Sequence, residues 1–236
     1  MNKWPKKLPP LTEEQKRISS DFMNRHLHAL QNKWYGFVEI FNHKYPIYSL
    51  KLQGREGRLL RTLEIGAGIG QHLNYENYSQ QEYYCNELLP ELCMEIKKRY
   101  PKVNVVPGDC QKRLPYEDAY FDRIIAIHVF EHLPNLPATI RESRRLIKPT
   151  GVLSVIIPCE GGMMTKIARN LSAKPHFEKL YKQNYDWFIK SQHINMPDEI
   201  LYELKQCFQV IHSMWFPLLV PSVNFNLFIG LTLKPR

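Results

Sequence analysis

The fold is decided by the stretch Arg61-Thr-Leu-Glu-Ile-Gly-Ala-Gly-Ile-Gly-Gln-His-Leu73. Its first half is a short apolar run bounded by polar residues, which is typical of a buried β-strand. Gly66, Gly68 and Gly70 follow at alternate positions, and glycine lets the chain turn sharply and lie directly against a ligand. Helix-forming sequence resumes around Gly70. A strand, a glycine turn and a helix start together predict a ligand site at the carboxyl edge of a parallel sheet.

The same stretch indicates a cationic ligand rather than a pyrophosphate. Its spacing is G-x-G-x-G, whereas the fingerprint of dinucleotide-binding folds is G-x-G-x-x-G. Glu64 lies two residues before the first glycine, and a carboxylate there would repel a pyrophosphate. The stretch closely resembles motif I of the class I S-adenosylmethionine (SAM) methyltransferases, whose cofactor carries a sulfonium and an α-amino group. The resemblance implies that the cofactor is lined by Glu64, Gly66, Ala67, Gly68 and Gly70.

Two further motifs follow at the ends of predicted strands. Residues 81–86 read as a second strand that ends at Glu87, and a carboxylate there can accept from both hydroxyls of a nucleoside ribose. Residues 103–106 read as a third strand, and the Gly-Asp-Cys after it resembles the family's G-D-A/C step, which meets the adenine. The resemblance therefore also assigns to the cofactor Glu87, Leu88, Asp109 and Cys110.

Residues 114–133 match the family's pattern LP-(F/Y)-x-D-x-x-FD-x-(I/V)…HV-(L/F)-EHL almost word for word. Residues 121–127 are the predicted fourth, central strand, and His128 comes at its carboxyl end, where the transferred methyl group should lie. His128 is accordingly assigned to both the cofactor and catalysis. Residues 148–151 resemble the family's KPGG turn. Residues 152–158 are fully apolar, which predicts a buried fifth strand.

The catalytic candidates are His128, His132 and Glu131. Transfer to an O–H or N–H acceptor requires alignment and a base near the methyl group. The spacing His128-x-x-Glu131-His132 also resembles the E-x-x-E-H of the ubiquinone-pathway and small-RNA 2′-O-methyltransferases, which hold a divalent metal. With His193 added, such a site would favour Mn²⁺, Fe²⁺ or Zn²⁺ over Mg²⁺. Because many small-molecule methyltransferases carry this segment without a metal, we expect none.

Segments on either side of these motifs are expected to cover the site. Residues 1–57 are expected to form a helical N-terminal extension, with one helix over about 12–30, and residues 58–236 the SAM-binding domain. A cationic and aromatic insertion at about 159–192 is typical of a substrate lid, and its alternative interpretation is a solvated helical excursion. The residues assigned to the substrate are Tyr35, His43, Glu160, Tyr185 and His193.

Composition and charge limit the remaining choices. The net charge is +9, which favours an anionic partner or reflects solvated surface lysines. The five scattered cysteines suggest neither a disulfide framework nor a zinc cluster, and no signal peptide is evident, so we expect a cytoplasmic protein. Residues 214–233 are apolar, but their prolines, asparagines and glycine favour strand–loop–strand over a membrane helix.

We therefore expect an α/β, Rossmann-like, seven-stranded sheet in the order 3-2-1-4-5-7-6. The predicted function is SAM-dependent methyl transfer to a hydroxyl or amine of a small polar acceptor, such as a sugar, nucleotide sugar or natural product. No transmembrane segment is expected, and a nucleic acid is the less favoured partner. The alternatives are an RNA 2′-O-methyltransferase and a catalytically silent SAM-binding scaffold.

Overall fold

The central feature of the computed structural model, which describes residues 3–23, 36–52 and 59–236, is one seven-stranded sheet. Its strand order is β3-β2-β1-β4-β5-β7-β6, as the sequence predicted. Strand β7 runs antiparallel to both of its neighbours. The strands are β1 (Leu60–Ile65), β2 (Gln81–Glu87), β3 (Asn104–Pro107), β4 (Phe121–Ile127), β5 (Ile147–Pro158), β6 (Phe208–Pro217) and β7 (Asn226–Pro235).

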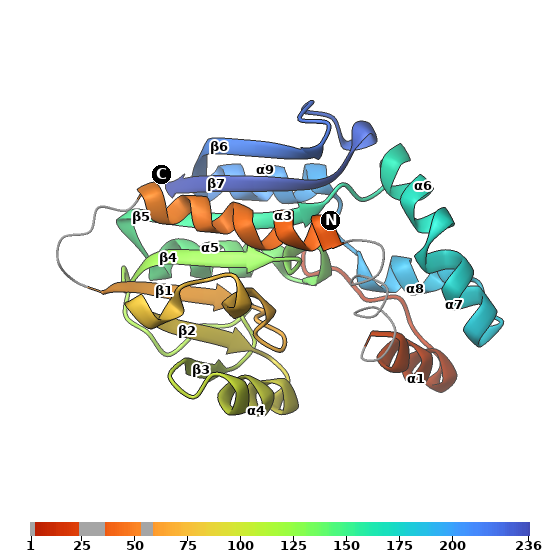
Figure 1. The fold of residues 1–236 in the computed structure, drawn as a ribbon, viewed down its shortest axis with the longest axis horizontal. Coiled ribbons are helices and arrows are strands. Elements are labelled where there is room, and N and C mark those ends of the chain that lie inside the picture. The colour runs from red at the N-terminus through yellow and green to blue at the C-terminus, as the bar shows by residue number, and fades with distance from the viewer. Residues whose placement is uncertain (1–2, 24–35, 53–58) are drawn as a thin grey trace.

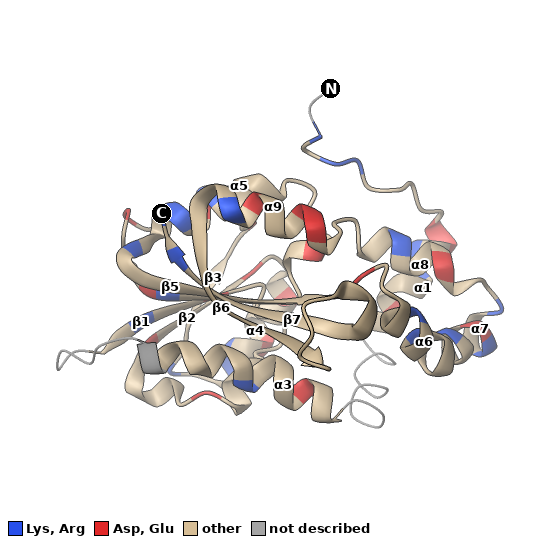
Figure 2. Cartoon of the chain, turned by 90° about the horizontal axis from the view of Figure 1, so that it is seen from above, with Lys and Arg blue, Asp and Glu red and all other residues tan. Residues whose placement is uncertain are grey.

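Helices cover both faces of the sheet and one of its ends. Helices α3 and α4 lie on one face and α5 and α9 on the other (Figure 2). Helices α1, α6, α7 and α8 gather beyond the carboxyl ends of the parallel strands (Figure 1). The described helices are α1 (Glu13–Asp21), α3 (Gly36–Ile47), α4 (Pro90–Arg99), α5 (Leu136–Leu146), α6 (Met163–Leu171), α7 (Ala173–Tyr181), α8 (Tyr185–Gln192) and α9 (Pro197–Cys207).

Two local expectations were wrong. The glycine turn leads into a 3₁₀ helix at Gln71–Asn74 and another at Tyr78–Gln80, not into an α-helix. Only ten residues separate Gly70 from β2, so a helix of ordinary length does not fit there. The expected turn at residues 148–151 belongs instead to β5, where the pairing with β4 shifts register.

The C-terminal expectations are confirmed. The apolar stretch forms the end of β6, a short loop and β7, which pair antiparallel. Helix α3 crosses this hairpin at Gly230. A Cβ at that position would come within 2.7 Å of the Tyr45 ring, so glycine leaves the room that the ring needs. In the part of the chain that the structure describes, no helix has the length and apolarity needed to cross a membrane.

The N-terminal segment contacts both the sheet domain and the insertion. Thr12 and Gln15 form a capping box that starts α1, and Phe22 then packs edge-on against Phe177 and Phe188 of the insertion, with ring centroids 5.0 and 5.2 Å away. The second half of the helix predicted at 12–30 lies largely outside the described residues. These aromatic rings give the N-terminal segment and the insertion a small shared core, separate from the core of the sheet.

A fully buried arginine connects the central strand to two other segments. Arg123 on β4 donates to Glu76 Oε2 at 3.0 Å, to Ser49 Oγ at 2.7 Å and to the Pro46 carbonyl at 2.7 Å. Glu76 also contacts His72 Nε2 at 3.0 Å. Burial alone would raise the pKa of Glu76, but Arg123 and His72 outweigh it and lower that pKa to about 2. The pair is therefore ionised, buried and hydrogen-bonded on every side.

We expect Arg123→Met to lower the free energy of unfolding by about 3–5 kcal/mol, because it leaves the Glu76 carboxylate buried without its counter-charge. The double variant Arg123→Met/Glu76→Gln should recover part of this loss, since the uncompensated charge is gone. Equilibrium urea denaturation measures both.

The matched control is Arg99→Met, which removes an exposed pair with Glu95 on α4 and should change stability by less than about 1 kcal/mol. A single Arg123 variant as stable as this control would contradict the interpretation. So would a double variant no more stable than Arg123→Met.

Candidate active site

The three glycines of the turn after β1 all adopt left-handed backbone conformations, with φ of 65°, 78° and 57° at Gly66, Gly70 and Gly68. A Cβ on Gly66 would lie 2.6 Å from Val129, and one on Gly70 would lie 2.9 Å from the Tyr100 ring. A Cβ on Gly68 would meet no described atom within 4 Å. The turn is therefore packed against the protein at two glycines and open at the third, which leaves room for a ligand.

Glu87 joins this turn to the start of α4. Its Oε2 accepts from the Gly68 N–H at 2.9 Å, and its Oε1 accepts from the Leu88 and Leu89 N–H groups at 2.8 and 3.1 Å. Leu88 itself is 60% exposed beside it. The carboxylate is thus held at the carboxyl end of β2, next to the open glycine.

The Asp109–Cys110 step lies at the neighbouring strand end. The Gly108 N–H donates to the Glu87 carbonyl at 2.9 Å, which fixes the end of β3 against the end of β2. Asp109 Oδ1 accepts from the backbone and side chain of Gln111 at 2.9 and 3.1 Å, while the Cys110 side chain is buried. The motifs assigned to ribose and adenine are therefore adjacent on one edge of the sheet.

Glu64 lies on β1, next to the last residue of the strand. Its carboxyl is buried in the core and accepts from the Tyr83 hydroxyl at 2.9 Å. Burial raises the pKa of Glu64 to about 8, so the group is mainly uncharged at neutral pH. Glu64 therefore offers no fixed negative charge at neutral pH, and its assignment to the cofactor stays a prediction.

His128 occupies the first position after β4 in an unusual conformation. Its φ is 54°, in a left-handed region that non-glycine residues rarely adopt and that costs of order 1–3 kcal/mol. Its backbone N–H donates to the Ile156 carbonyl at 3.0 Å, and its Nδ1 lies 3.2 Å from Glu131 Oε1. The ring also meets the edge of Phe228, and 29% of the side chain is exposed.

Glu131 is buried close to three histidines. Its side chain is 1% exposed, and its Oε2 is buried without a hydrogen-bond partner among the described residues. Burial alone would raise the pKa of Glu131, but the hydrogen bond with His128 and the nearby His132 and His193 lower it to about 2. A carboxylate charge is therefore maintained inside the loop that follows β4.

The loop that carries His132 is hydrogen-bonded to the segment that carries His193. His132 Nδ1 donates to the Gln192 carbonyl at 2.7 Å. The Ile194 and Asn195 N–H groups donate to the Glu131 carbonyl at 2.9 and 3.0 Å. The Asn195 amide donates to two more carbonyls of the same loop. Loss of solvation lowers the pKa of His132, so its ring is neutral at pH 7.

His193 is held from its other side by the first residues of the insertion. Its Nδ1 lies 2.5 Å from Glu160 Oε2, and Arg169 donates to both oxygens of the same carboxylate. Burial alone would raise the pKa of Glu160, but Arg169 and His193 outweigh it and hold that pKa well below its usual range. Glu160 is therefore ionised, and its carboxylate orients the His193 ring.

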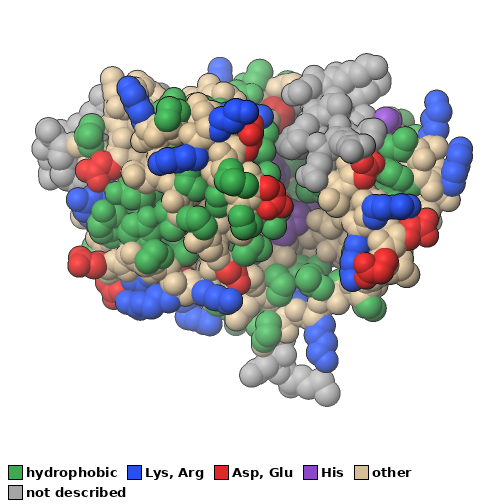
Figure 3. Space-filling model, turned by 90° about the horizontal axis from the view of Figure 1, so that it is seen from below, with side chains coloured by type: hydrophobic (Ala, Val, Ile, Leu, Met, Phe, Trp, Pro, Cys, Tyr) green, Lys and Arg blue, Asp and Glu red, His purple; other side chains and the backbone are tan. Residues whose placement is uncertain are grey.

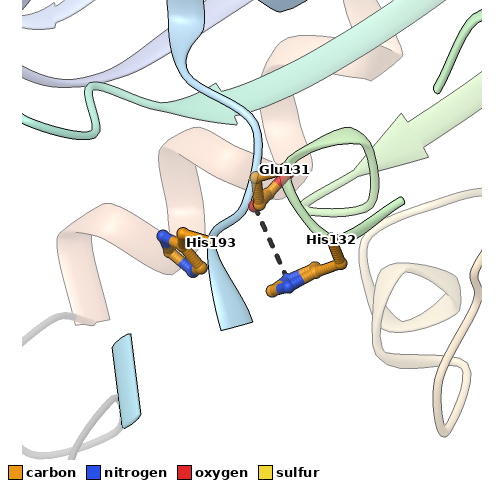
Figure 4. Close-up of side chains that lie close together, drawn as sticks. All are labelled: Glu131, His132 and His193. Atoms are coloured by element: carbon orange, nitrogen blue, oxygen red, sulfur yellow. Dashed lines mark ion pairs between the residues drawn. The ribbon is translucent and has the colours of Figure 1, made fainter. Parts of the chain in front are cut away.

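The structure brings together some of the predicted substrate residues and separates others. His193 lies beside Glu131 and His132 (Figure 4), and Glu160 contacts His193. Figure 3 shows histidine side chains in a hollow of the surface. His43 is instead buried against His72 and Tyr75. Tyr185 is buried in the aromatic core of the insertion. Tyr35 lies outside the described residues.

Three residues of the site were missed. Arg169, Asn195 and Phe228 each act through partners 24 or more residues away, respectively His193, Phe130 and His128. Arg169 stood out only as one of several cations in the insertion, and no local pattern marks the other two. An asparagine just ahead of a helix reads as an ordinary loop residue.

The residues present fit the cofactor that the resemblance implies. The open side of Gly68 lies beside the Glu87 carboxylate, and Asp109 is at the next strand end. A nucleoside needs these groups in that order along a sheet edge. They leave His128 at the following strand end, where a transferred group would meet its acceptor.

Comparisons with known proteins agree with this geometry. A family model described as a methyltransferase domain matches residues 63–155. A sterol 4-C-methyltransferase from Caenorhabditis elegans is 30% identical over 39% of this chain and 26% of its own length. A malonyl-[acyl-carrier protein] O-methyltransferase from Erwinia pyrifoliae is 28% identical over 46% of this chain and 41% of its own length. The chain thus matches less than half the length of either curated relative.

A solved structure extends the likeness to the whole fold. The 1,6-didemethyltoxoflavin-N1-methyltransferase from Burkholderia thailandensis, crystallised with S-adenosylhomocysteine, superposes with a TM-score of 0.59 over 97% of this chain and 92% of its own, at 15% identity. The resemblance seen in the sequence is confirmed by the family model, and the predicted fold by the strand order. Residues 63–155 thus match the family model of a methyltransferase domain, and the chain has the fold of the class I SAM-dependent methyltransferases.

Proposed function

We propose that this protein transfers a methyl group from SAM to a hydroxyl or amine of a small polar acceptor. The observation that carries the proposal is the alignment of groups along the carboxyl edge of the sheet. The ends of β1, β2, β3 and β4 present, in turn, the glycine turn, Glu87, Asp109 and His128. In a doubly wound sheet this edge is where ligands bind.

Each group has a separate task in binding. Glu87 accepts from the ribose hydroxyls, and the Gly68 backbone approaches the methionine end. Asp109 and the backbone of Cys110 receive the adenine. A hydrogen bond to a charged group contributes about 1.5–3 kcal/mol to binding. Because Glu87 accepts two such bonds from the ribose, it makes the largest single polar contribution to cofactor binding in this arrangement.

The reaction requires a proton acceptor beside the methyl group. SAM, when bound, supplies a methyl group activated by a positively charged sulfur. His128 takes the proton from the acceptor O–H or N–H through its Nε2, because its Nδ1 is held by Glu131 Oε1 at 3.2 Å. Glu131 stabilises the imidazolium that forms, since it remains charged in the folded protein. Such a base contributes about 10²–10⁴-fold to the rate.

The polar side chains around His128 favour a polar acceptor. His128, His132 and His193 are each partly exposed, at 29%, 33% and 17% of their side chains, and Glu160, which is paired with Arg169, contacts His193. The aromatic rings of the insertion pack mainly against one another. Hydrogen bonds rather than ring stacking therefore determine which acceptor fits. The acceptors named for the two curated relatives, a sterol and an acyl-carrier protein, differ too much to decide it.

The runner-up functions remain RNA 2′-O-methylation and SAM binding without catalysis. The net charge of +9 favours the first, and an enzyme acting on RNA would lose affinity steeply with salt. A histidine held by a buried carboxylate at the strand end counts against the second. We retain the cytoplasm as the compartment, because all five cysteines are free and an oxidising compartment favours disulfides.

We expect Glu87→Ala to weaken S-adenosylhomocysteine binding by at least about 10-fold, because the variant loses both ribose hydrogen bonds. Gly68→Val should abolish binding, because its side chain would enter the open space beside the turn. Isothermal calorimetry measures both affinities. Glu91→Ala, an exposed glutamate on α4, is the control and should bind normally. Unchanged affinity in Glu87→Ala would overturn the cofactor assignment.

We expect His128→Asn to lower kcat by about 10²–10⁴-fold, with a smaller loss of S-adenosylhomocysteine affinity. Asparagine tolerates the left-handed backbone at this position, so the loop after β4 keeps its shape. Single-turnover transfer from labelled SAM is the measurement. His176→Asn, on α7 of the insertion, is the control. A variant that keeps its kcat within tenfold of the wild type would remove His128 as the base.

We expect label from SAM to appear in nucleotide sugars or glycans rather than in total RNA. The panel should also contain a sterol and a malonylated acyl-carrier protein, because the curated relatives act on these. Assays at 50 and 200 mM salt separate the outcomes, since an enzyme that neutralises 6–10 phosphates would lose about 10³–10⁵ in affinity between them. Label in RNA alone, with that salt dependence, would replace this proposal with the runner-up.

A further inference from the structure

A cluster of two histidines and one glutamate lies where the loop after β4 meets the segment ahead of α9. One potential ligand atom from each of Glu131, His132 and His193 lies within 4.8 Å of the others. Figure 4 shows the three side chains, two from the loop and one from the segment opposite. Ligands of one metal ion are separated by about 3–4 Å when each bond is about 2.0–2.2 Å long. Small movements of the side chains would therefore bring all three into coordination distance.

The two imidazoles are already arranged as metal ligands are. His132 donates its Nδ1–H to the Gln192 carbonyl at 2.7 Å, and His193 donates its Nδ1–H to the Glu160 carboxylate at 2.5 Å. In each ring this leaves the Nε2 lone pair free. Metal-binding histidines almost always donate their other N–H to a carbonyl or carboxylate in this way, which fixes the tautomer and the ring orientation.

The Glu131 carboxylate faces His128 and His132 with Oε1, at 3.2 and 3.9 Å, and a cation bound to this carboxylate would offset the burial of its charge. Glu131 Oε1 pairs with His128, but Oε2 is fully buried and has no hydrogen-bond partner among the residues that the structure describes. A buried carboxylate oxygen without a partner is costly, and native proteins rarely leave one. Glu160 cannot supply a positive charge, and Arg169 is already engaged by both oxygens of Glu160.

We propose that Glu131, His132 and His193 bind one divalent transition-metal ion. Two imidazole nitrogens and one carboxylate oxygen favour Mn²⁺, Fe²⁺ or Zn²⁺ over Mg²⁺ and Ca²⁺, which prefer oxygen ligands. Glu160 and Arg169 are then positioning residues, because they hold the His193 ring. The proposal replaces the expectation that no metal binds, and it leaves His128 outside the set of ligands.

Three protein ligands leave coordination positions open on the ion. In the reaction proposed above, acceptor oxygens would fill them beside His128. This role rests on the proposed function, whereas the binding of the ion does not.

The test is calorimetric titration of Zn²⁺ into EDTA-treated, dialysed protein, without SAM or acceptor. We expect one ion per chain, and Glu131→Gln and His193→Gln should each weaken binding by at least 10-fold. His176→Asn, a histidine outside the cluster, is the control and should bind as the wild type does. Co²⁺ provides a second readout, because its visible absorption reports coordination by the protein directly. Equilibrium urea denaturation of each variant verifies that it is folded.

Absence of stoichiometric Zn²⁺ binding by the wild type would overturn the proposal. Equal Zn²⁺ affinity in the wild type, Glu131→Gln and His193→Gln would also overturn it, since the ion would then sit elsewhere. Because no outcome involves methyl transfer, these results are separate from the fate of the proposed function.

Discussion

The buried ion pair between Arg123 and Glu76 is the interaction on which the arrangement around the site depends. One guanidinium joins the central strand, the segment that follows the glycine turn and the end of the N-terminal helix α3. The strand leads directly to His128, and the turn carries the open glycine. Other polar contacts, such as Gln71 with Glu39, join two of these segments, but Arg123 bonds to all three, and directional hydrogen bonds to a planar fork fix positions more strictly than apolar packing does.

Most of the sheet could be predicted from the sequence because its signals are local. The β1 strand and its glycine turn, the acid at the end of β2 and the apolar run of β5 are each recognisable within a few residues. The prediction of a helix after Gly70 was wrong because tertiary constraints overrode propensity. Only ten residues connect the turn to β2. Helix α3 of the N-terminal segment packs across the sheet instead.

The candidate site was predicted less completely, for a different physical reason. His128, Glu131 and His132 are adjacent in the sequence and were found together. His193 and Glu160 were predicted as substrate residues, but how the two side chains meet depends on a contact across 33 residues. His43 and Tyr185 looked like ligand contacts, yet both became core residues, because periodicity cannot distinguish an aromatic face that packs inward from one that meets a ligand.

The left-handed conformation of His128 has a consequence for the history and engineering of this chain. The strain lowers stability by of order 1–3 kcal/mol, a sizeable part of what holds a domain folded. Glycine would relieve all of it and asparagine some. A library of variants selected for heat resistance alone would therefore drift toward these residues at position 128, and under the proposed role of His128 as the base it would enrich robust but inactive proteins. If heat resistance and activity were selected together, persistence of histidine at this position would measure how strong the selection for activity is.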